Sequence, residues 1–240
     1  LTGLEPQTII LATGVVVTLY TLLGGIEAVI WTDVAQSFIL IAGALVTVAL
    51  LFHDMPEGPA QLFAIAFEQG KFSLGSLALD FTSSTVWVVL LYGLFINLNN
   101  FGIDQSYVQR YHAARSEREA RRALWLAAAL YLPLSLLFLF IGTGIYALYE
   151  VHPELAIGIA SADAAFPHFI MQRMPDGVSG MFLAALFAAG MSSIDTSLNS
   201  SATVILSDLY RGYIEPRPTE RRSMQVLYAS TIMAGALGTV

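Results

Sequence analysis

The sequence has no cysteine and little charge. Lysine, arginine, aspartate and glutamate make up 12% of its 240 residues, about half of the roughly 25% found in soluble domains. Without cysteine no disulfide framework can form. No nucleophile elbow, phosphate loop or metal-binding histidine spacing occurs, so we expect no enzyme. The low charge, a hydrophobic share of 56% and a mean hydropathy of +0.67 predict an all-α, polytopic membrane protein, with the lipid bilayer and not nucleic acid as its partner.

The chain begins at Leu1 rather than at a methionine, and a hydrophobic run is still in progress at Val240. No signal peptide precedes the first apolar stretch. We therefore expect an internal piece of a longer protein, with residues 1–240 forming part of a single transmembrane domain.

Six stretches are apolar enough to be transmembrane helices, each of which needs about 20 such residues. They are predicted at residues 8–24, 27–52, 84–107, 121–149, 178–207 and 224–240. Nine of the eleven basic residues lie in the loops after the third and fifth of these spans. Because lysine and arginine gather on the cytoplasmic side, we expect both loops there, together with a tight hairpin at Gly24–Asp33. The acidic loops 53–83 and 150–177 then lie outside, and the second is predicted to contain a short helix at Ala162–Met174.

Small and hydroxyl side chains line one face of the fifth span. Ala189, Ser192, Ser193 and Thr196 follow the spacing i, i+3, i+4 and i+7, which brings them to one helical stripe. Such a stripe can simply pack against a neighbouring helix. Asp195 favours another interpretation, because a carboxylate in mid-membrane needs a cation, a proton or an arginine partner. Hydroxyl, carbonyl and carboxylate oxygens are ligands for a hard cation.

A second carboxylate, Asp33, lies about two turns into the second span. It could stabilise the start of that helix through the helix dipole. It could also lie at the same depth as Asp195 on a facing helix. Together the two acids would form a richer oxygen site than either alone.

The third span has a short apolar stretch followed by polar residues. Such a short, glycine-interrupted segment indicates a transporter binding site. Asn97 falls near the middle of the membrane, where its amide can donate and accept hydrogen bonds. Asp104 and Gln105 lie closer to the cytoplasm as candidate gate residues, although they could equally cap the helix or pair with Arg110.

Three stretches resemble the solute:sodium symporter family, which includes the sodium–glucose, sodium–proline and sodium–sialic acid cotransporters. They are YTLLGGIEAVIWTDVAQ from Tyr20, NLNNFGIDQSYVQRY from Asn97, and the long segment from Phe166 to Arg211, which contains AAGMSSIDTSLNS. The resemblance implies a LeuT-like fold of two inverted five-helix repeats, of which six helices are present here. It implies a Na⁺-coupled symporter of a small organic solute, working by alternating access in an integral, multi-pass location, expected to be a bacterial inner membrane.

The resemblance also implies roles for individual residues. Half of a shared Na⁺ site corresponds to Ala189, Ser192 and Ser193, and its other half belongs to a helix absent from this chain. A second Na⁺ position of some members corresponds to residues that all offer oxygen here: Asp33, Ser192, Asp195 and Thr196.

The implied substrate site departs from that of the sugar-transporting members. Asn97 matches a substrate-contacting asparagine, while Asn100 stands where those members have a gate tyrosine. Their sugar-binding lysine has no equivalent near Leu130–Pro133. A sugar, a sialic acid, a monocarboxylate and an amino acid therefore all remain candidate solutes. A solute-sensing membrane domain of a sensor kinase is the alternative function.

Overall fold

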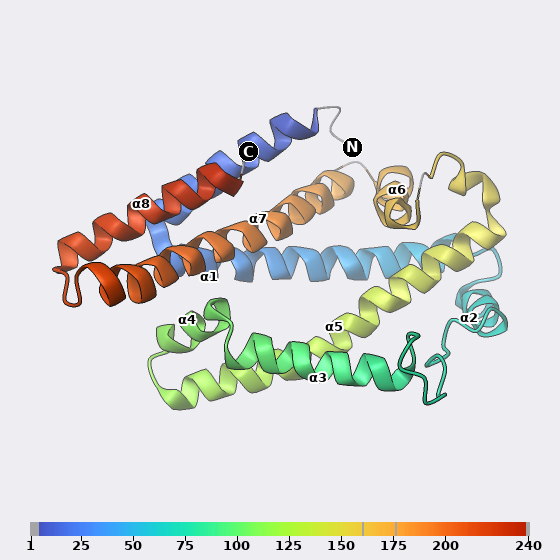
Figure 1. The fold of residues 1–240 in the computed structure, drawn as a ribbon. Helices are drawn as coiled ribbons and strands as arrows, with labels where there is room; N and C mark the ends of the chain where they lie inside the picture. Colours follow the sequence, from blue (N-terminus) through green and yellow to red (C-terminus); the bar gives the residue numbers. More distant parts are fainter. Residues whose placement is uncertain (1–4, 160, 176, 239–240) are drawn as a thin grey trace. The chain divides into compact units, whose positions relative to one another are not determined.

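The computed structural model describes residues 5–159, 161–175 and 177–238, and regular structure within them is helical (Figure 1). Six helices make up the first part of the chain: α1 (Pro6–Asp54), α2 (Pro59–Glu68), α3 (Val86–Gly102), α4 (Gln105–Ala113), α5 (Glu117–Val151) and the 3₁₀ turn η1 (Pro153–Ala156). The remainder are the 3₁₀ turn η2 (Ala162–Ala164), α6 (Ala165–Arg173), α7 (Val178–Val204), the π-helical segment η3 (Ile205–Ile214) and α8 (Glu220–Gly238).

These elements form two compact units. The first unit comprises Phe38–Leu98 and Arg121–Ala184. The second comprises the described parts of Thr2–Ser37, Asn99–Ala120 and Ala185–Val240. The candidate site predicted from Asp33 and Asp195 falls entirely within the second unit.

The first unit has an apolar core where the end of α1 meets α2, α5 and α6. Leu51, Leu62 and Phe169 are fully buried in it. Close packing is tightest at Gly43, where an added Cβ would lie 2.2 Å from the Phe182 ring. At the edge of this unit Arg173 forms a two-pronged ion pair with Asp54, at 2.7 and 2.8 Å. The Asp54 carboxylate accepts hydrogen bonds from the Arg173 guanidinium and raises the pKa of that arginine.

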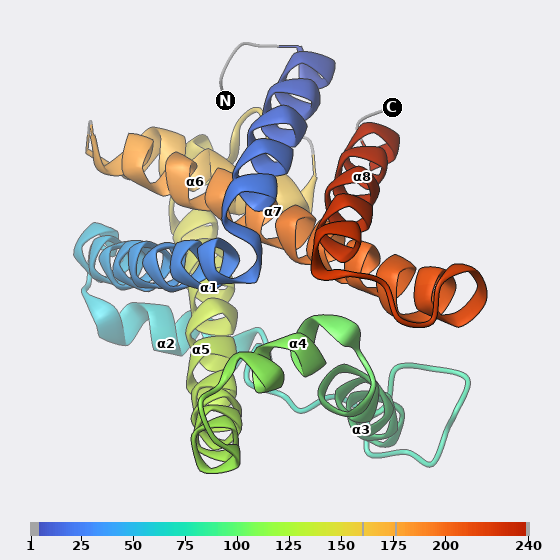
Figure 2. The same ribbon diagram turned by 90° about the vertical axis from the view of Figure 1, so that its left-hand side faces the viewer.

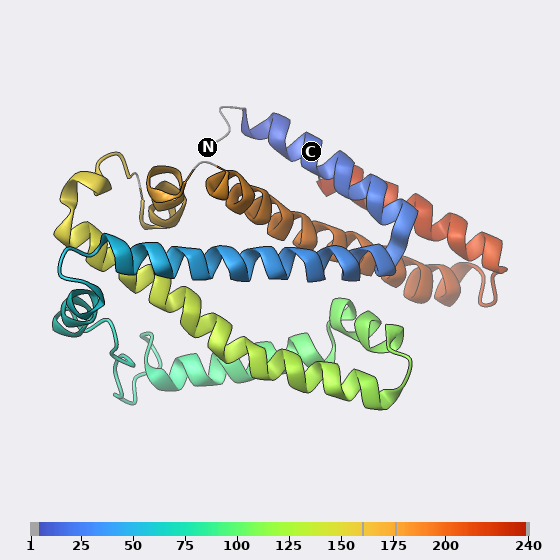
Figure 3. The same cartoon turned by 180° about the vertical axis from the view of Figure 1, so that it is seen from behind.

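In the second unit α1 is interrupted at Gly25, whose φ of 52° and ψ of −147° are not helical. Glycine tolerates this conformation because it has no Cβ. Figure 3 shows the ribbon of α1 turning back at this position. The break lies between the first two predicted spans, but the expected hairpin Gly24–Asp33 is wrong in extent. Residues after Gly25 are helical again, so that Asp33 is carried on a helix, as its predicted place about two turns into the second span requires.

Helix α8 follows η3 and lies beside the first part of α1 in the second unit (Figure 2). The approach is close at Gly235, where an added Cβ would be 2.3 Å from the Thr18 hydroxyl oxygen. A small residue is therefore required at this crossing, as is common between membrane helices.

The predicted third span does not continue as one helix to residue 107. Helix α3 ends at Gly102, and α4 begins at Gln105. Asp104 causes the restart because its carboxylate accepts a hydrogen bond from the Ser106 backbone N–H at 2.8 Å, which caps the first turn of a new helix. In contrast, the short helix expected at Ala162–Met174 is confirmed as η2 and α6.

Three helical stretches among the described residues are long and apolar enough to cross a membrane: Gln7–Asp54, Glu117–Val151 and Val178–Ile214. The number rises to four if α3 and α4 form one bent span. Six spans would require the break at Gly25 to divide two of them and α8 to serve as the last. The count of six and the predicted boundaries therefore stay predictions.

Candidate cation site

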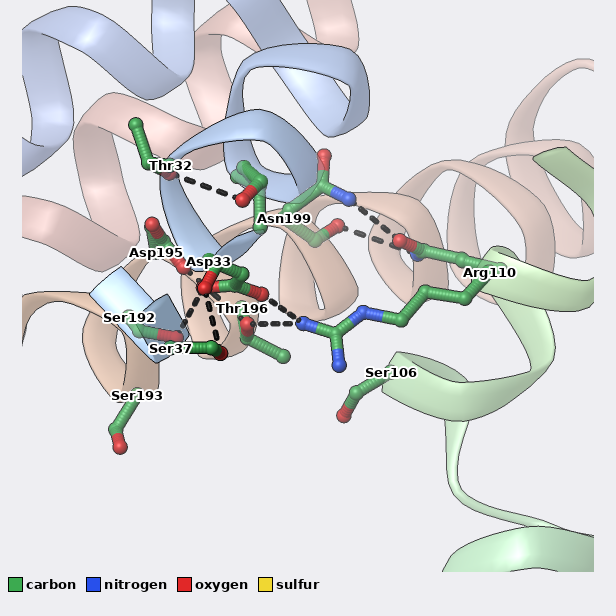
Figure 4. Close-up of polar contacts among 12 residues, drawn as sticks. Thr32, Asp33, Ser37, Ser106, Arg110, Ser192, Ser193, Asp195, Thr196 and Asn199 are labelled. Atoms are coloured by element: carbon green, nitrogen blue, oxygen red, sulfur yellow. Dashed lines mark hydrogen bonds and ion pairs between the residues drawn. The ribbon is translucent and has the colours of Figure 1, made fainter. Parts of the chain in front are cut away.

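Two carboxylates lie among hydroxyl groups in the second unit (Figure 4). Asp33, on α1, accepts a hydrogen bond from the Ser192 hydroxyl through Oδ1. Asp195, on α7, accepts one from the Tyr20 hydroxyl through Oδ2 and one from the Thr196 hydroxyl through Oδ1 at 3.2 Å. The structure thus gathers the oxygen-bearing side chains that were predicted to form a second Na⁺ position.

Helical spacing explains why α7 can present this set. Ser192, Asp195, Thr196 and Asn199 follow the spacing i, i+3, i+4 and i+7, so they face the same side of the helix. On α1, residues following the break at Gly25 have resumed a helical path, and this path carries Asp33 toward that face. The cluster therefore depends on one interrupted helix and one continuous helix.

The cluster is sheltered but not closed. Asp195 has no exposed surface, whereas the Asp33 side chain is 22% exposed to solvent. Hard oxygen donors of this kind suit an alkali or alkaline-earth cation better than a transition metal. The described part of the chain contains no cluster of three or more histidine, cysteine, aspartate or glutamate side chains that could hold a metal ion by those groups alone.

A guanidinium also reaches the cluster. Arg110 Nη2 donates to Asp33 Oδ2 at 2.6 Å and to the Thr196 hydroxyl oxygen at 3.1 Å. Of the two alternatives left open for Asp104, capping a helix or pairing with Arg110, the structure shows the cap. Asp104 is engaged instead with the backbone N–H and hydroxyl of Ser106.

Of the predicted shared-site residues, Ser193 lies on another side of α7 from the carboxylate cluster. Ser193 is exposed and donates its hydroxyl to the Ala189 carbonyl at 3.4 Å. In Figure 4 the Ser193 side chain points away from Asp33 and Asp195. Ser192, between the two sets, binds Asp33. The structure thus separates Ser193 from the two carboxylates, while Ser192, which belongs to both predicted sets, contacts Asp33.

The predicted solute and gate residues are distributed over both units. Asn97 belongs to the first unit, where its amide donates to the Gly93 carbonyl at 2.7 Å. Asn100 is half-buried in the second unit. Gln105 lines a cavity of about 660 Å³ in that unit. Within the second unit, no hydrogen bond among the described residues joins Asn100 or Gln105 to the carboxylate cluster.

The cavity has a mixed lining of apolar and polar side chains, which includes one histidine, His112. Its walls include Gln109 and Asn199, which hydrogen-bond each other through Asn199 Nδ2 and Gln109 Oε1. Thr21 also lines it, and the buried hydroxyl of this residue has no hydrogen-bond partner among the described residues. No aspartate, glutamate, lysine or arginine is among the described residues that line it.

Two members of the cluster were missed by sequence reasoning. Tyr20 opens one of the motifs that carry the family resemblance, but it lies 175 residues from its partner Asp195. Arg110 lies 77 residues from Asp33 and was counted among the basic residues that indicate orientation. The signal in the sequence that could have pointed to these two residues was their position inside the motifs that resemble the family.

Comparison with known proteins places the chain in a family. The sodium:solute symporter family matches residues 1–240. The sodium/sialic acid symporter NanT of Aliivibrio fischeri is 33% identical over 238 residues, which cover 99% of this chain and 47% of that protein. The human sodium-coupled monocarboxylate transporter 1 is 28% identical over 240 residues, covering 98% and 39%.

A solved structure of a Na⁺-coupled sialic acid symporter has a similar fold. It was described as a substrate-bound outward-open state with a novel Na⁺ site. Its TM-score is 0.94 at 32% identity, with 99% of this chain and 51% of that chain covered. The chain therefore spans about half the length of the relatives it matches.

The chain belongs to the sodium:solute symporter family. It is accordingly part of an integral, multi-pass membrane protein and not of an enzyme. In this family Na⁺ is a co-transported substrate rather than a prosthetic group.

Proposed function

We propose that the whole protein is a Na⁺-coupled symporter of a small organic solute. The observation that carries this proposal is the gathering of Asp33, Ser192, Asp195 and Thr196 oxygens in a member of this family. Buried carboxylates are costly unless a cation or hydrogen-bond donors compensate them. Members of this family co-transport Na⁺, which is therefore the cation proposed for this site.

Two Na⁺ positions are proposed on α7. The first uses the Ala189 carbonyl with the Ser192 and Ser193 hydroxyls, completed by a helix outside this chain. The second uses Asp33, Asp195, Thr196 and again Ser192. Each elementary charge moving through the full membrane potential releases about 2.3 kcal/mol per 100 mV, so two ions would roughly double the electrical driving force.

The fold proposed for the whole protein is the LeuT-like pair of inverted repeats, to which this chain would contribute six spans. Alternating access would then carry Na⁺ and solute from one side of the membrane to the other. Ligands shift such an equilibrium only through their different affinities for the two states. A bacterial inner membrane is the proposed location.

The solute is proposed to contact Asn97, with Asn100 nearby in the sequence and Asp104 and Gln105 toward the cytoplasmic gate. Two of the relatives are named for transport of sialic acid and of monocarboxylates, and both kinds of solute carry a carboxylate. They are the first solutes to test, followed by neutral sugars and amino acids.

The test is uptake by the purified full-length protein in liposomes. An inward Na⁺ gradient should drive accumulation of one of these solutes, and an equal K⁺ gradient should not. Accumulation that does not depend on Na⁺, or binding of a solute without transport, would overturn the proposal.

A further inference from the structure

The guanidinium of Arg110 donates hydrogen bonds to oxygens that are proposed to bind the second Na⁺. Its Nη2 donates to Asp33 Oδ2 at 2.6 Å and to Thr196 Oγ1 at 3.1 Å. Thr196 in turn donates to Asp195. One fixed positive charge on α4 is therefore bound to one acid of the pair directly and linked to the other through a single hydroxyl (Figure 4).

Arg110 and Na⁺ compete for the same oxygens. A guanidinium has donors only and remains charged at any physiological pH, while Na⁺ must be coordinated by oxygen lone pairs. The other carboxylate oxygen of Asp33 already accepts the Ser192 hydroxyl. A cation bound between Asp33 and Thr196 would therefore compete with Arg110 for these oxygens and repel its charge.

The position of Arg110 allows it to be displaced. Its side chain is 35% exposed, so that the guanidinium can leave the cluster without entering an apolar core. It is carried by α4, a helix of nine residues with its own N-cap at Asp104. The basic segment that follows α4 is predicted to be cytoplasmic, which is the side on which Na⁺ must be released.

We propose that Arg110 is a tethered counter-cation that replaces Na⁺ at Asp33 and Thr196 while the carrier returns empty. This inference rests on the proposed Na⁺-coupled symport. A carrier that has released Na⁺ must bring its carboxylates back through the membrane, and an uncompensated buried charge strongly opposes that step. Arg110 neutralises one acid for the return, and Na⁺ displaces it in the next cycle.

The experiment compares two modes of transport by the full-length protein in liposomes. Net uptake requires the empty carrier to return. Exchange of labelled for unlabelled solute, with saturating Na⁺ on both sides, does not. In Arg110→Gln we expect net uptake to slow roughly tenfold, equivalent to about 1.4 kcal/mol in the limiting barrier, while exchange is retained.

The same variant should need less Na⁺, because the competing cation has been removed. We expect the Na⁺ concentration for half-maximal exchange to fall by about threefold, the scale of a partly exposed ion pair. Arg115→Gln is the matched control, since it removes the same charge from an exposed position of the same basic segment. It should leave the ratio of net uptake to exchange unchanged.

Several outcomes would overturn the inference. Equal losses of uptake and exchange with an unchanged Na⁺ requirement would make Arg110 a structural brace, and no change in either mode would leave it without a role. If Arg110→Gln does not reach the membrane, Arg110→Lys decides the question, because lysine keeps the charge without the planar fork. That variant should retain exchange and slow net uptake less than tenfold; equal losses in both modes would refute the counter-cation. Wild-type protein lacking any Na⁺-dependent flux would instead remove the proposed symport.

Discussion

Tyr20 donates its hydroxyl to Asp195, joining the first part of α1 to the middle of α7 across 175 residues of sequence. Asp195 is fully buried, and its other oxygen accepts the Thr196 hydroxyl. The tyrosine therefore both satisfies and orients a carboxylate that is proposed to bind Na⁺. The segment before the break at Gly25 contributes to the site in this way, although it carries none of the predicted ligands.

Replacing Tyr20 with phenylalanine should weaken Na⁺ binding while keeping the ring in place. A buried acceptor left without its donor costs about 1 kcal/mol or more, so the half-saturating Na⁺ concentration for uptake should rise roughly fivefold. Tyr213→Phe, at an exposed position of the same unit, is the control. An unchanged Na⁺ requirement in Tyr20→Phe would mean that the hydrogen bond has no part in ion binding.

Asp195→Ala should remove the second Na⁺ position and spare the first. The Ala189, Ser192 and Ser193 oxygens do not depend on this carboxylate in the structure. The Hill coefficient of uptake for Na⁺ should therefore fall toward one. A wild-type coefficient already near one would count against a second ion.

Ser193→Ala should abolish Na⁺-driven uptake without preventing membrane insertion, because the exposed hydroxyl of Ser193 hydrogen-bonds within its own helix and is proposed to bind the shared ion. Insertion is checked by the yield of folded protein in detergent. Ser197→Ala is the matched control, since Ser197 is likewise exposed on α7 and bonds the Ser193 carbonyl. Normal uptake by Ser193→Ala would remove the shared-site assignment.

Gly25→Ala should destabilise the second unit. A Cβ is poorly tolerated at a φ of 52° and a ψ of −147°, and such strain costs on the order of 1–3 kcal/mol. Thermal unfolding in detergent should therefore occur at a lower temperature than in wild type. Gly93→Ala serves as the control, because an added Cβ there meets no atom within 4 Å; equal effects of the two changes would argue against strain at Gly25.

Much of the site could be predicted because its signals are local. The spacing of Ser192, Asp195 and Thr196 along one helix follows from the helical repeat. Asp33 was recognisable because an acid inside an apolar stretch is rare. The proposal that Asp33 and Asp195 could meet came from their estimated depths, and the structure brings both into one hydrogen-bonded cluster.

Other features could not be predicted from spacing. The restart of the helix at Asp104 depends on whether its carboxylate caps α4 or binds Arg110, and both were compatible with the sequence. The outcome leaves Arg110 available to Asp33. A local hydrogen bond thus influences which distant ion pair forms.

The sequence by itself determined the class of the protein, the polar face of its fifth predicted span and the family to which it belongs. These depend on composition, helical periodicity and contiguous motifs, all of which are properties of neighbouring residues. The tertiary structure alone decided that Tyr20 and Arg110 complete the cluster. Their partners lie 175 and 77 residues away, and only the packing of α1 and α4 against α7 brings donors and acceptors within hydrogen-bonding distance.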